Sequence, residues 1–315
     1  MSSLLKAAAS LLVALLLTAP AMGSARAQVQ TITTDRDQFG WSDLVSIGDR
    51  SLFVHCEGAG EPLVVLESGL GGTSGDWSLV QGEIARQTRV CAYDRAWLGQ
   101  SEPDDRLPHN AADASRDLHA LLAAMGVDQP IVLVGFSIGG LLARHYASVY
   151  PDDVSALVLI DPTPPVWTAM TLSGYAHHSR EERLREFSGL DPAEPEPLDI
   201  LKAGEEVFTG PLPTMPAYML TSGIKSTNPG MFGDERRHIA TRLQEDQARE
   251  LDAVHEIAER CTHQLPSECA GDVSAFIVRA VNETAGSSAD AGWSLAMIGN
   301  DSGRTRRKAL AGAHS

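Results

Sequence analysis

The feature that most constrains the fold is a series of short, continuously apolar runs separated by turn residues and helical periodicities. Four of these runs cover residues 63–66, 90–93, 131–134 and 156–160. Runs of this length without polar alternation are typical of strands that are buried on both faces. Strands that alternate with helices predict an α/β fold, in which helices cover both faces of a mostly parallel sheet.

The stretches between and after these runs indicate the remaining elements. Leu118, Leu121, Leu122 and Met125 recur at helical spacing and predict an amphipathic helix. Residues 162–214 interrupt the alternation, because they are rich in Pro and Glu and contain no buried strand, so we expect an inserted helical cap there. The other expected elements are a hairpin at 43–47 and 51–57, helices at 77–87, 111–125, 138–149, 233–250 and 267–281, and strands at 217–221 and 253–258.

The composition is that of a folded globular chain. Apolar residues make up 43% of the 315 residues and charged residues 21%, which excludes a disordered chain, a collagen and a coiled coil. The net charge is −16, and a strongly acidic surface repels phosphate backbones, so nucleic acid is not expected as a partner. The length suits one large or two ordinary domains, and the oligomeric state is left open.

The N-terminus has the three parts of a secretory signal peptide. Lys6 supplies a positive charge, residues 7–19 form an apolar run of 13, and Ala25-Arg26-Ala27 provides small residues around a cleavage site. The apolar run is too short to cross about 30 Å of hydrocarbon as a helix. We expect cleavage after Ala27 and export to the periplasm or the extracellular space without a stable membrane span. An uncleaved membrane anchor is the alternative.

These patterns divide the chain into three expected parts. We expect a signal peptide at 1–27, one α/β domain at 28–282 that contains the cap insertion at about 162–214, and a loosely ordered C-terminal tail at 283–315. The tail is expected because the sequence after Glu283 turns to Ser, Gly, Ala and Asp.

The four cysteines are interpreted through the expected export. Cys56, Cys91, Cys261 and Cys269 can form disulfides in three ways in an oxidising compartment. The chain has no C-x-x-C and no paired His at zinc-ligand spacing. We favour the pairs 56–91, from two strand-like runs, and 261–269, around a loop-like stretch. Four buried free thiols are the alternative.

One pentapeptide carries the chemistry. Gly135-Phe136-Ser137-Ile138-Gly139 connects the expected strand 131–134 to the expected helix 138–149. In this strand–turn–helix context, G-x-S-x-G places the serine on a strained turn, where its Oγ stands clear at the carboxyl end of the strand. The adjacent helix N-terminus favours developing negative charge. Ser137 is therefore the candidate nucleophile, with a structural turn serine as the alternative.

Three further segments follow or contain the buried runs: Leu66–Gly72, Tyr93–Ser101 and Leu157–Pro162. Together with the pentapeptide they resemble the α/β-hydrolase superfamily. In that family these positions hold the oxyanion loop after strand 3, the end of strand 4 and strand 6. Two departures are Glu67-Ser68-Gly69, where many members have His-Gly, and Trp97, which replaces a common Gly. The resemblance covers roughly residues 43–282 and implies an α/β-hydrolase fold.

The resemblance implies that a catalytic histidine follows the acid in the chain. His263 lies just after the expected strand 253–258, where that family places this histidine. For the acid, Asp161 directly follows the strand 156–160, as in pancreatic-type lipases, and Asp234 is close behind the strand 217–221, after which many members carry it. We favour Asp161, because an acid on a short turn after a neighbouring strand leaves less loop entropy to fix.

Two backbone N–H groups are expected to complete the site. Ile138 follows the nucleophile, and Leu70 lies in the loop after strand 63–66, the two positions that form the oxyanion hole in this family. These residues predict an exported serine hydrolase that cleaves a small-molecule carboxylic ester through an acyl-enzyme, with no metal or organic cofactor. The alternatives are hydrolysis of an amide, thioester or carbon–carbon bond, and a non-catalytic ligand-binding protein on the same scaffold.

Overall fold

The computed structural model describes residues 40–166, 196–224 and 234–298, with the side chains of 234–238 and 286–298 outside the description. The predicted signal peptide at 1–27 and the larger part of the predicted cap, residues 167–195, therefore lie outside the described residues.

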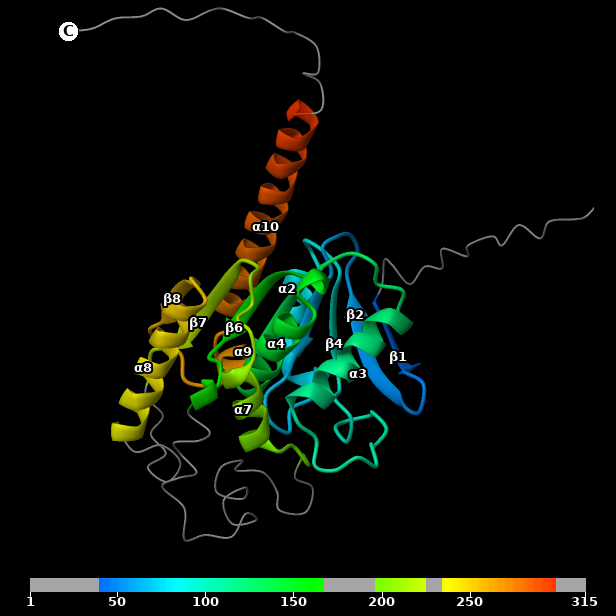
Figure 1. Cartoon of the computed structure of the whole chain (residues 1–315), viewed down its shortest axis with the longest axis vertical. Coiled ribbons are helices and arrows are strands. Elements are labelled where there is room, and N and C mark those ends of the chain that lie inside the picture. Colours follow the sequence, from blue (N-terminus) through cyan, green and yellow to red (C-terminus); the bar gives the residue numbers. More distant parts are fainter. Residues whose placement is uncertain (1–39, 167–195, 225–233, 299–315) are drawn as a thin grey trace, which may run out of the picture. The chain divides into compact units, whose positions relative to one another are not determined.

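The described residues form an eight-stranded sheet in the order β1-β2-β4-β3-β5-β6-β7-β8 (Figure 1). The pairs β1–β2 and β2–β4 are antiparallel, and the others are parallel. This confirms the predicted mostly parallel sheet and places the carboxyl ends of six parallel strands, β3–β8, at one edge. The strands are β1 (Trp41–Ser46), β2 (Ser51–Glu57), β3 (Val64–Glu67), β4 (Val90–Tyr93), β5 (Ile131–Phe136), β6 (Val154–Ile160), β7 (Ala217–Ser222) and β8 (Val254–Ala258).

Helices cover both faces of the sheet. One face packs against α3, α4 and the end of α8, and the other packs against α2 and α10. Neighbouring residues of a buried strand face opposite layers, so Val64 joins one core and Val65 the other. The helices are η1 (Ser74–Trp77), α2 (Ser78–Ile84), α3 (Ala111–Ala124), α4 (Ile138–Val149), η2 (Pro151–Asp153), α7 (Ile200–Thr209), α8 (Asp234–Glu250), α9 (Leu265–Glu268) and α10 (Ala270–Ile298).

The described end of the predicted cap packs onto the main body. Ile200, Ala203 and Val207 of α7 form a small apolar cluster with residues of α4, including Ile138, next to the candidate nucleophile. A β-bridge between His109 and Leu198 ties the chain before α7 to the body. The described part of the cap is therefore attached close to the carboxyl edge of the sheet.

Helix α10 is longer than the sequence pattern predicted. It continues to Ile298, whereas we expected the last helix to end at 281 and a loosely ordered tail to begin at 283 (Figure 1). Residues 283–298 contain no Pro and include Ala, Leu and Met, which are good helix formers, so the Ser and Gly residues among them do not end the helix. Residues 299–315 lie outside the described part of the chain.

Two disulfides match the favoured pairing. Cys56 and Cys91 are directly opposed residues of β2 and β4, and their disulfide joins these strands. The disulfide between Cys261 and Cys269 closes the loop that follows β8.

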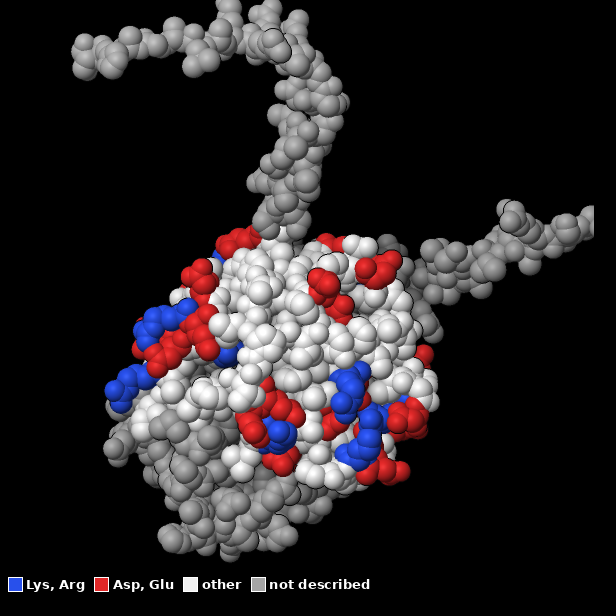
Figure 2. All heavy atoms as spheres, viewed as in Figure 1, with Lys and Arg blue, Asp and Glu red and all other residues white. Residues whose placement is uncertain are grey.

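Two features of the described residues concern binding to nucleic acid and to membranes, namely the distribution of surface charge and the hydropathy of the helices. On the face shown in Figure 2, the described Lys and Arg residues lie in small groups together with Asp and Glu. None of the described helices is both long enough and apolar enough to cross a membrane.

Candidate active site

Ser137 occupies a strained turn between β5 and α4. Its φ of 54° and ψ of −120° lie outside the regions that side-chain-bearing residues ordinarily adopt. Its backbone N–H donates to Ile160 O at 3.0 Å, and its carbonyl accepts from Thr163 N at 2.9 Å. These hydrogen bonds hold the turn against the end of β6, as expected for a strained conformation that the surrounding structure stabilises.

The two glycines of the pentapeptide are required by close packing. A Cβ on Gly135 would lie 2.4 Å from Gly139 O, and a Cβ on Gly139 would lie 2.4 Å from Ser68 O. Both distances are too short for any side chain. The sharp turn therefore brings the start of α4 against the loop that follows β3.

His263 connects the candidate nucleophile to an acid. It lies on the loop between β8 and α9, and its Nε2 is 3.0 Å from Ser137 Oγ. Its Nδ1 is 2.6 Å from Asp161 Oδ2. The imidazole also packs against the Phe136 ring, with the ring centres 5.1 Å apart. The structure thus brings together the three residues that the sequence predicted as nucleophile, base and acid.

Asp161 directly follows β6 and has a side chain only 6% exposed. Besides His263, it accepts hydrogen bonds from Ser222 N (3.1 Å), Ser222 Oγ (2.9 Å) and Gln244 Nε2 (3.0 Å). Burial alone raises the pKa of Asp161, but the hydrogen bonds and charge of His263 and the bonds from Ser222 outweigh it and hold this pKa below its usual value. The carboxylate is therefore ionised and directed at Nδ1 of the imidazole.

Ser222 and Gln244 were missed by the sequence reasoning. Ser222 ends β7, and its hydroxyl supports the acid that follows the neighbouring strand β6. Gln244 lies on α8 and also donates to Pro162 O at 2.9 Å, so it fixes the turn that carries Asp161. The alternative acid, Asp234, is the first residue of α8, and its side chain is not among those described.

The loop after β3 lies against the nucleophile. A Cβ on Gly69 would lie 3.3 Å from the Phe136 ring and 3.6 Å from Ser137 Cβ. The predicted oxyanion donors, Leu70 and Ile138, are therefore close to Ser137 in the chain or in space. No hydrogen bond among the described residues uses the backbone N–H of either.

Comparison with known proteins agrees with this geometry. A model of the alpha/beta hydrolase fold family matches residues 62–183. RutD from Cronobacter sakazakii, which is named as a carbamate hydrolase, is 34% identical over 136 residues, which are 42% of this chain and 47% of RutD. A solved structure described as a lipase from Acinetobacter baumannii has a TM-score of 0.58 at 17% identity and covers 79% of this chain and 93% of its own.

The chain has the α/β-hydrolase fold, and its residues 62–183 match the model of that family. An enol-lactonase from Burkholderia xenovorans shares the fold with a TM-score of 0.53 at 16% identity, over 76% of this chain and 100% of that chain. At such identities the structural likeness concerns the fold alone. The match to RutD spans less than half of that relative's length.

The two departures from the α/β-hydrolase pattern have structural explanations. Trp97 has a φ of 76°, the left-handed conformation that favours the Gly common in the family at this position. Its indole N–H donates to Asp104 O at 2.9 Å. Glu67 is buried and ion-paired with Arg95 at 2.7 Å, so this carboxylate has an internal partner.

Two groups of described side chains have possible metal-ligand atoms close together, but neither forms a site. Cys261, Cys269 and Asp272 include both cysteines of a disulfide. In the group Asp104, His109 and Asp117, both carboxylates pair with the guanidinium of Arg50, which is 3.1 Å from Asp104 and hydrogen-bonded to Asp117. The charge of Arg50 already offsets that of these carboxylates.

Proposed function

We propose that this α/β-hydrolase is a serine hydrolase that cleaves carboxylic esters of small molecules through an acyl-enzyme. The observation that carries the proposal is the continuous chain of polar contacts from Ser137 Oγ through His263 to Asp161, at 3.0 and 2.6 Å. A serine hydroxyl is a weak nucleophile until a base removes its proton, and this arrangement supplies one.

The mechanism follows from the roles that each position allows. His263 Nε2 takes the proton from Ser137 Oγ as this oxygen attacks the substrate carbonyl carbon, and it returns the proton to the leaving group. The Asp161 carboxylate accepts from Nδ1–H, which fixes the tautomer and stabilises the imidazolium. Water then attacks the acyl-enzyme with His263 again as the base. The N–H groups of Leu70 and Ile138 stabilise the oxyanion in both steps.

A second candidate is hydrolysis of a carbamate or amide. The name of RutD as a carbamate hydrolase favours it, because cleavage of a C–N bond uses the same nucleophile, base and oxyanion donors. The non-catalytic alternative receives no support from the geometry, since the serine, histidine and acid are all present and in contact.

Active-site labelling and substrate profiling together test the proposal. The purified protein is treated with a fluorophosphonate probe and assayed with p-nitrophenyl esters of increasing acyl length and with matched aryl carbamates and amides. We expect labelling at Ser137 and faster turnover of esters, with both lost in Ser137→Ala. Labelling that survives this substitution would overturn the nucleophile, and turnover of carbamates alone would favour the second candidate.

We further propose that the protein is exported and cleaved after Ala27. Both disulfides support this, because structural disulfides form and persist in oxidising compartments. Intact-mass analysis of secreted or periplasmic protein is expected to give Gln28 as the first residue. Titration of four free thiols in a denaturant without reductant would contradict the compartment.

A further inference from the structure

Arg95 lies behind the loop that follows β3 and is almost completely buried, with a side chain 7% exposed. A guanidinium has five N–H groups, and in Arg95 each has an acceptor. Three acceptors are carboxylate oxygens and two are backbone carbonyls of the loop. The contacts run from Nε to Glu196 Oε1 (2.7 Å), from Nη1 to Glu67 Oε1 (2.7 Å) and Ser68 O (2.6 Å), and from Nη2 to Gly69 O (2.7 Å) and Glu196 Oε2 (2.8 Å).

The carbonyl of Gly69 determines where the predicted oxyanion donor points. In a trans peptide, the C=O of one residue and the N–H of the next point in opposite directions. Arg95 holds Gly69 O from behind the loop, so the N–H of Leu70 is directed away from Arg95. Gly69 itself lies next to Ser137 and Phe136.

We propose that Arg95 is a positioning residue for catalysis, which fixes the Gly69–Leu70 peptide so that the Leu70 N–H faces the oxyanion formed at Ser137. The proposal rests on the proposed function, since it assigns this N–H to the oxyanion hole. Arg95 touches neither substrate nor nucleophile and acts through the backbone of the loop.

Glu196 secures the other end of the same loop. Its carboxylate accepts hydrogen bonds from Nε and Nη2 of Arg95 and from the backbone N–H of Gly71, the last at 2.7 Å. The N–H of Gly72 donates to Gly69 O at 3.1 Å, which closes the turn between these contacts. The backbone that follows Glu196 is held in turn by two hydrogen bonds with His109, from His109 N to Pro197 O and from Asp199 N to His109 O.

The charge balance explains why an arginine stands here. Burial of the guanidinium lowers the pKa of Arg95, but the carboxylates of Glu196 and Glu67 raise it above its usual value, so the group is charged. Only a planar fork with five donors can bind two carbonyls and two carboxylates at once. A lysine would preserve the charge but not this geometry.

A role for Arg95 in binding a substrate anion does not fit the structure. All five of its N–H groups are used by the protein, and the cavity beside it, lined also by His109, Asp117 and Glu196, has a volume of only about 10 Å³. That space is comparable to one water molecule.

The test compares Arg95→Lys with Arg50→Lys. Arg50 is a matched control because it is also buried between two carboxylates, Asp104 and Asp117, but it has no contact with the loop. Both variants keep the charge and lose a buried fork, so both are expected to lose stability. Only Arg95→Lys is expected to lower kcat, by about 10²-fold or more with little change in KM, because an oxyanion donor acts in the transition state.

Glu196→Gln provides a second variant if Arg95→Lys does not fold. The amide still accepts from Gly71 but loses the charged pairing with Arg95, so we expect a smaller fall in kcat, again at constant KM. A fall in kcat for Arg95→Lys or Glu196→Gln no larger than that for Arg50→Lys overturns the proposal.

A crystal structure of Arg95→Lys separates this proposal from the proposed function. We expect the Gly69–Leu70 peptide to be rotated relative to the wild-type protein. An unchanged peptide overturns the positioning role even if activity falls. If the wild-type protein is neither labelled by the fluorophosphonate nor active on any ester, carbamate or amide, the proposed function fails. The crystal structure of Arg95→Lys still shows in that case whether Arg95 fixes the orientation of the Gly69–Leu70 peptide.

Discussion

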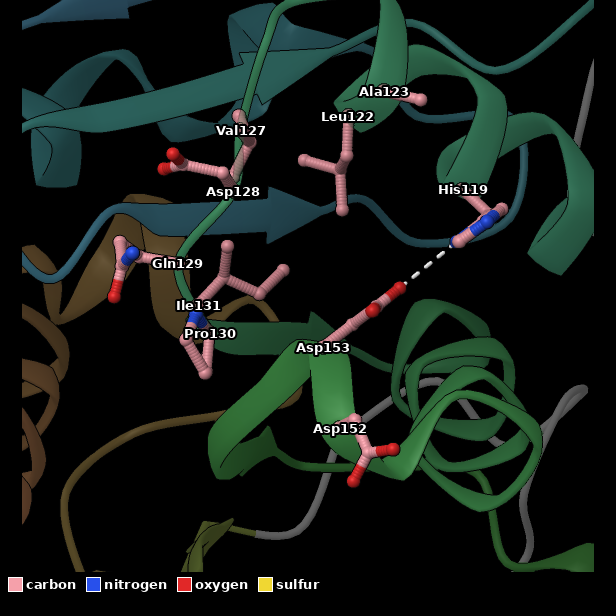
Figure 3. A pocket seen from close by; sticks show the side chains of 10 residues that line it. All are labelled: His119, Leu122, Ala123, Val127, Asp128, Gln129, Pro130, Ile131, Asp152 and Asp153. Atoms are coloured by element: carbon pink, nitrogen blue, oxygen red, sulfur yellow. Dashed lines mark hydrogen bonds and ion pairs between the residues drawn. The ribbon is translucent and has the colours of Figure 1, made fainter.

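Among the described residues, two histidine–aspartate pairs lie at opposite edges of the sheet. His263 and Asp161 lie at the carboxyl edge with 2.6 Å between Nδ1 and Oδ2, and His119 and Asp153 lie at the amino edge with 2.9 Å between the same atoms. The second pair lines an open pocket of about 220 Å³ (Figure 3). By the distance between Nδ1 and the carboxylate, the two pairs are alike.

Their surroundings differ in every respect that matters for catalysis. Asp161 has a side chain 6% exposed, whereas that of Asp153 is 34% exposed. The second nitrogen of His263 contacts a serine on a strained turn, whereas the ring of His119 stacks on Tyr150 at 4.2 Å. The pocket around His119 is lined by apolar and acidic side chains and by Gln129 and Pro130.

The comparison teaches that a histidine–aspartate pair is not by itself a catalytic site. Acyl transfer requires a nucleophile and oxyanion donors at the same place, and the candidate nucleophile and the predicted donors lie at the carboxyl edge. There the loops after β3, β5, β6 and β8 converge, as is general for open sheets with parallel strands.

The sharpest test removes each histidine in turn. His263→Ala and Ser137→Ala are expected to lower kcat on an ester by about 10⁴-fold or more, and the double variant is expected to be little worse, because these residues act as a unit. His119→Ala is expected to retain nearly full kcat. Steady-state kinetics with circular dichroism as a check on folding provides the measurement. A large loss in His119→Ala with an intact fold would break the comparison.

The two aspartates provide the next test. Asp161→Asn keeps the shape of the side chain but stabilises the wrong imidazole tautomer. We therefore expect a loss of about 10⁴-fold in kcat, which is the loss that the same change causes in another serine hydrolase. Asp153→Asn is expected to leave kcat nearly unchanged.

The same assay decides between the two acids that the sequence left open. Asp234→Asn is expected to retain activity. If it shows the large loss while Asp161→Asn stays folded and active, the acid comes from the segment after β7 and the assignment of Asp161 is wrong.

The two disulfides allow a smaller, graded test. Cys261 and Cys269 enclose the loop that carries His263, whereas Cys56 and Cys91 join two strands away from it. Replacing Cys261 and Cys269 with Ala is expected to lower kcat by about tenfold to 10²-fold, because small displacements of a catalytic group are costly. Replacing Cys56 and Cys91 is expected to lower the thermal midpoint with little change in kcat. Equal effects on kcat would show that the loop does not depend on its disulfide.

The parts of this site that depend on local sequence were predictable. The buried strands have a continuous apolar pattern, and the pentapeptide around Ser137 has its context in the adjacent strand and helix. The adjacency of the strands that carry Ser137 and Asp161 and the position of His263 relied on resemblance to a family, because pairing between distant segments leaves no local signal. The disulfide pairs followed from their places in strands and loop.

The parts that depend on distant contacts were not predictable. Gln244 lies on α8, whose sequence is mostly polar, so no periodicity marks the side chain that reaches Asp161. Arg95 and Glu196 are 101 residues apart, and neither has a local feature that distinguishes it from a surface charge. The end of α10 was misplaced because Ser and Gly weaken a helix without ending it.

The smallest expected effect concerns acid stability and sharpens the description of Asp161. Its folded-state pKa is lower than the ordinary value of 3.8, because hydrogen bonds from His263 and Ser222 outweigh the effect of burial. A carboxylate of this kind stabilises the fold above the unfolded-state pKa, and the contribution is lost as the pH falls through the folded-state pKa. Wild-type protein should therefore lose stability relative to Asp161→Asn below about pH 4.

Urea unfolding of both proteins between pH 2 and 7 measures this difference. Ser222→Ala is the matched control, because it removes the 2.9 Å hydrogen bond from Oγ but keeps the one from the backbone N–H. It should raise the folded-state pKa of Asp161 part of the way, so the loss of stability in acid should be smaller and should end at a higher pH than in the wild-type protein. If the difference between wild type and Asp161→Asn stays constant down to pH 2, the carboxylate does not titrate as this network of hydrogen bonds requires.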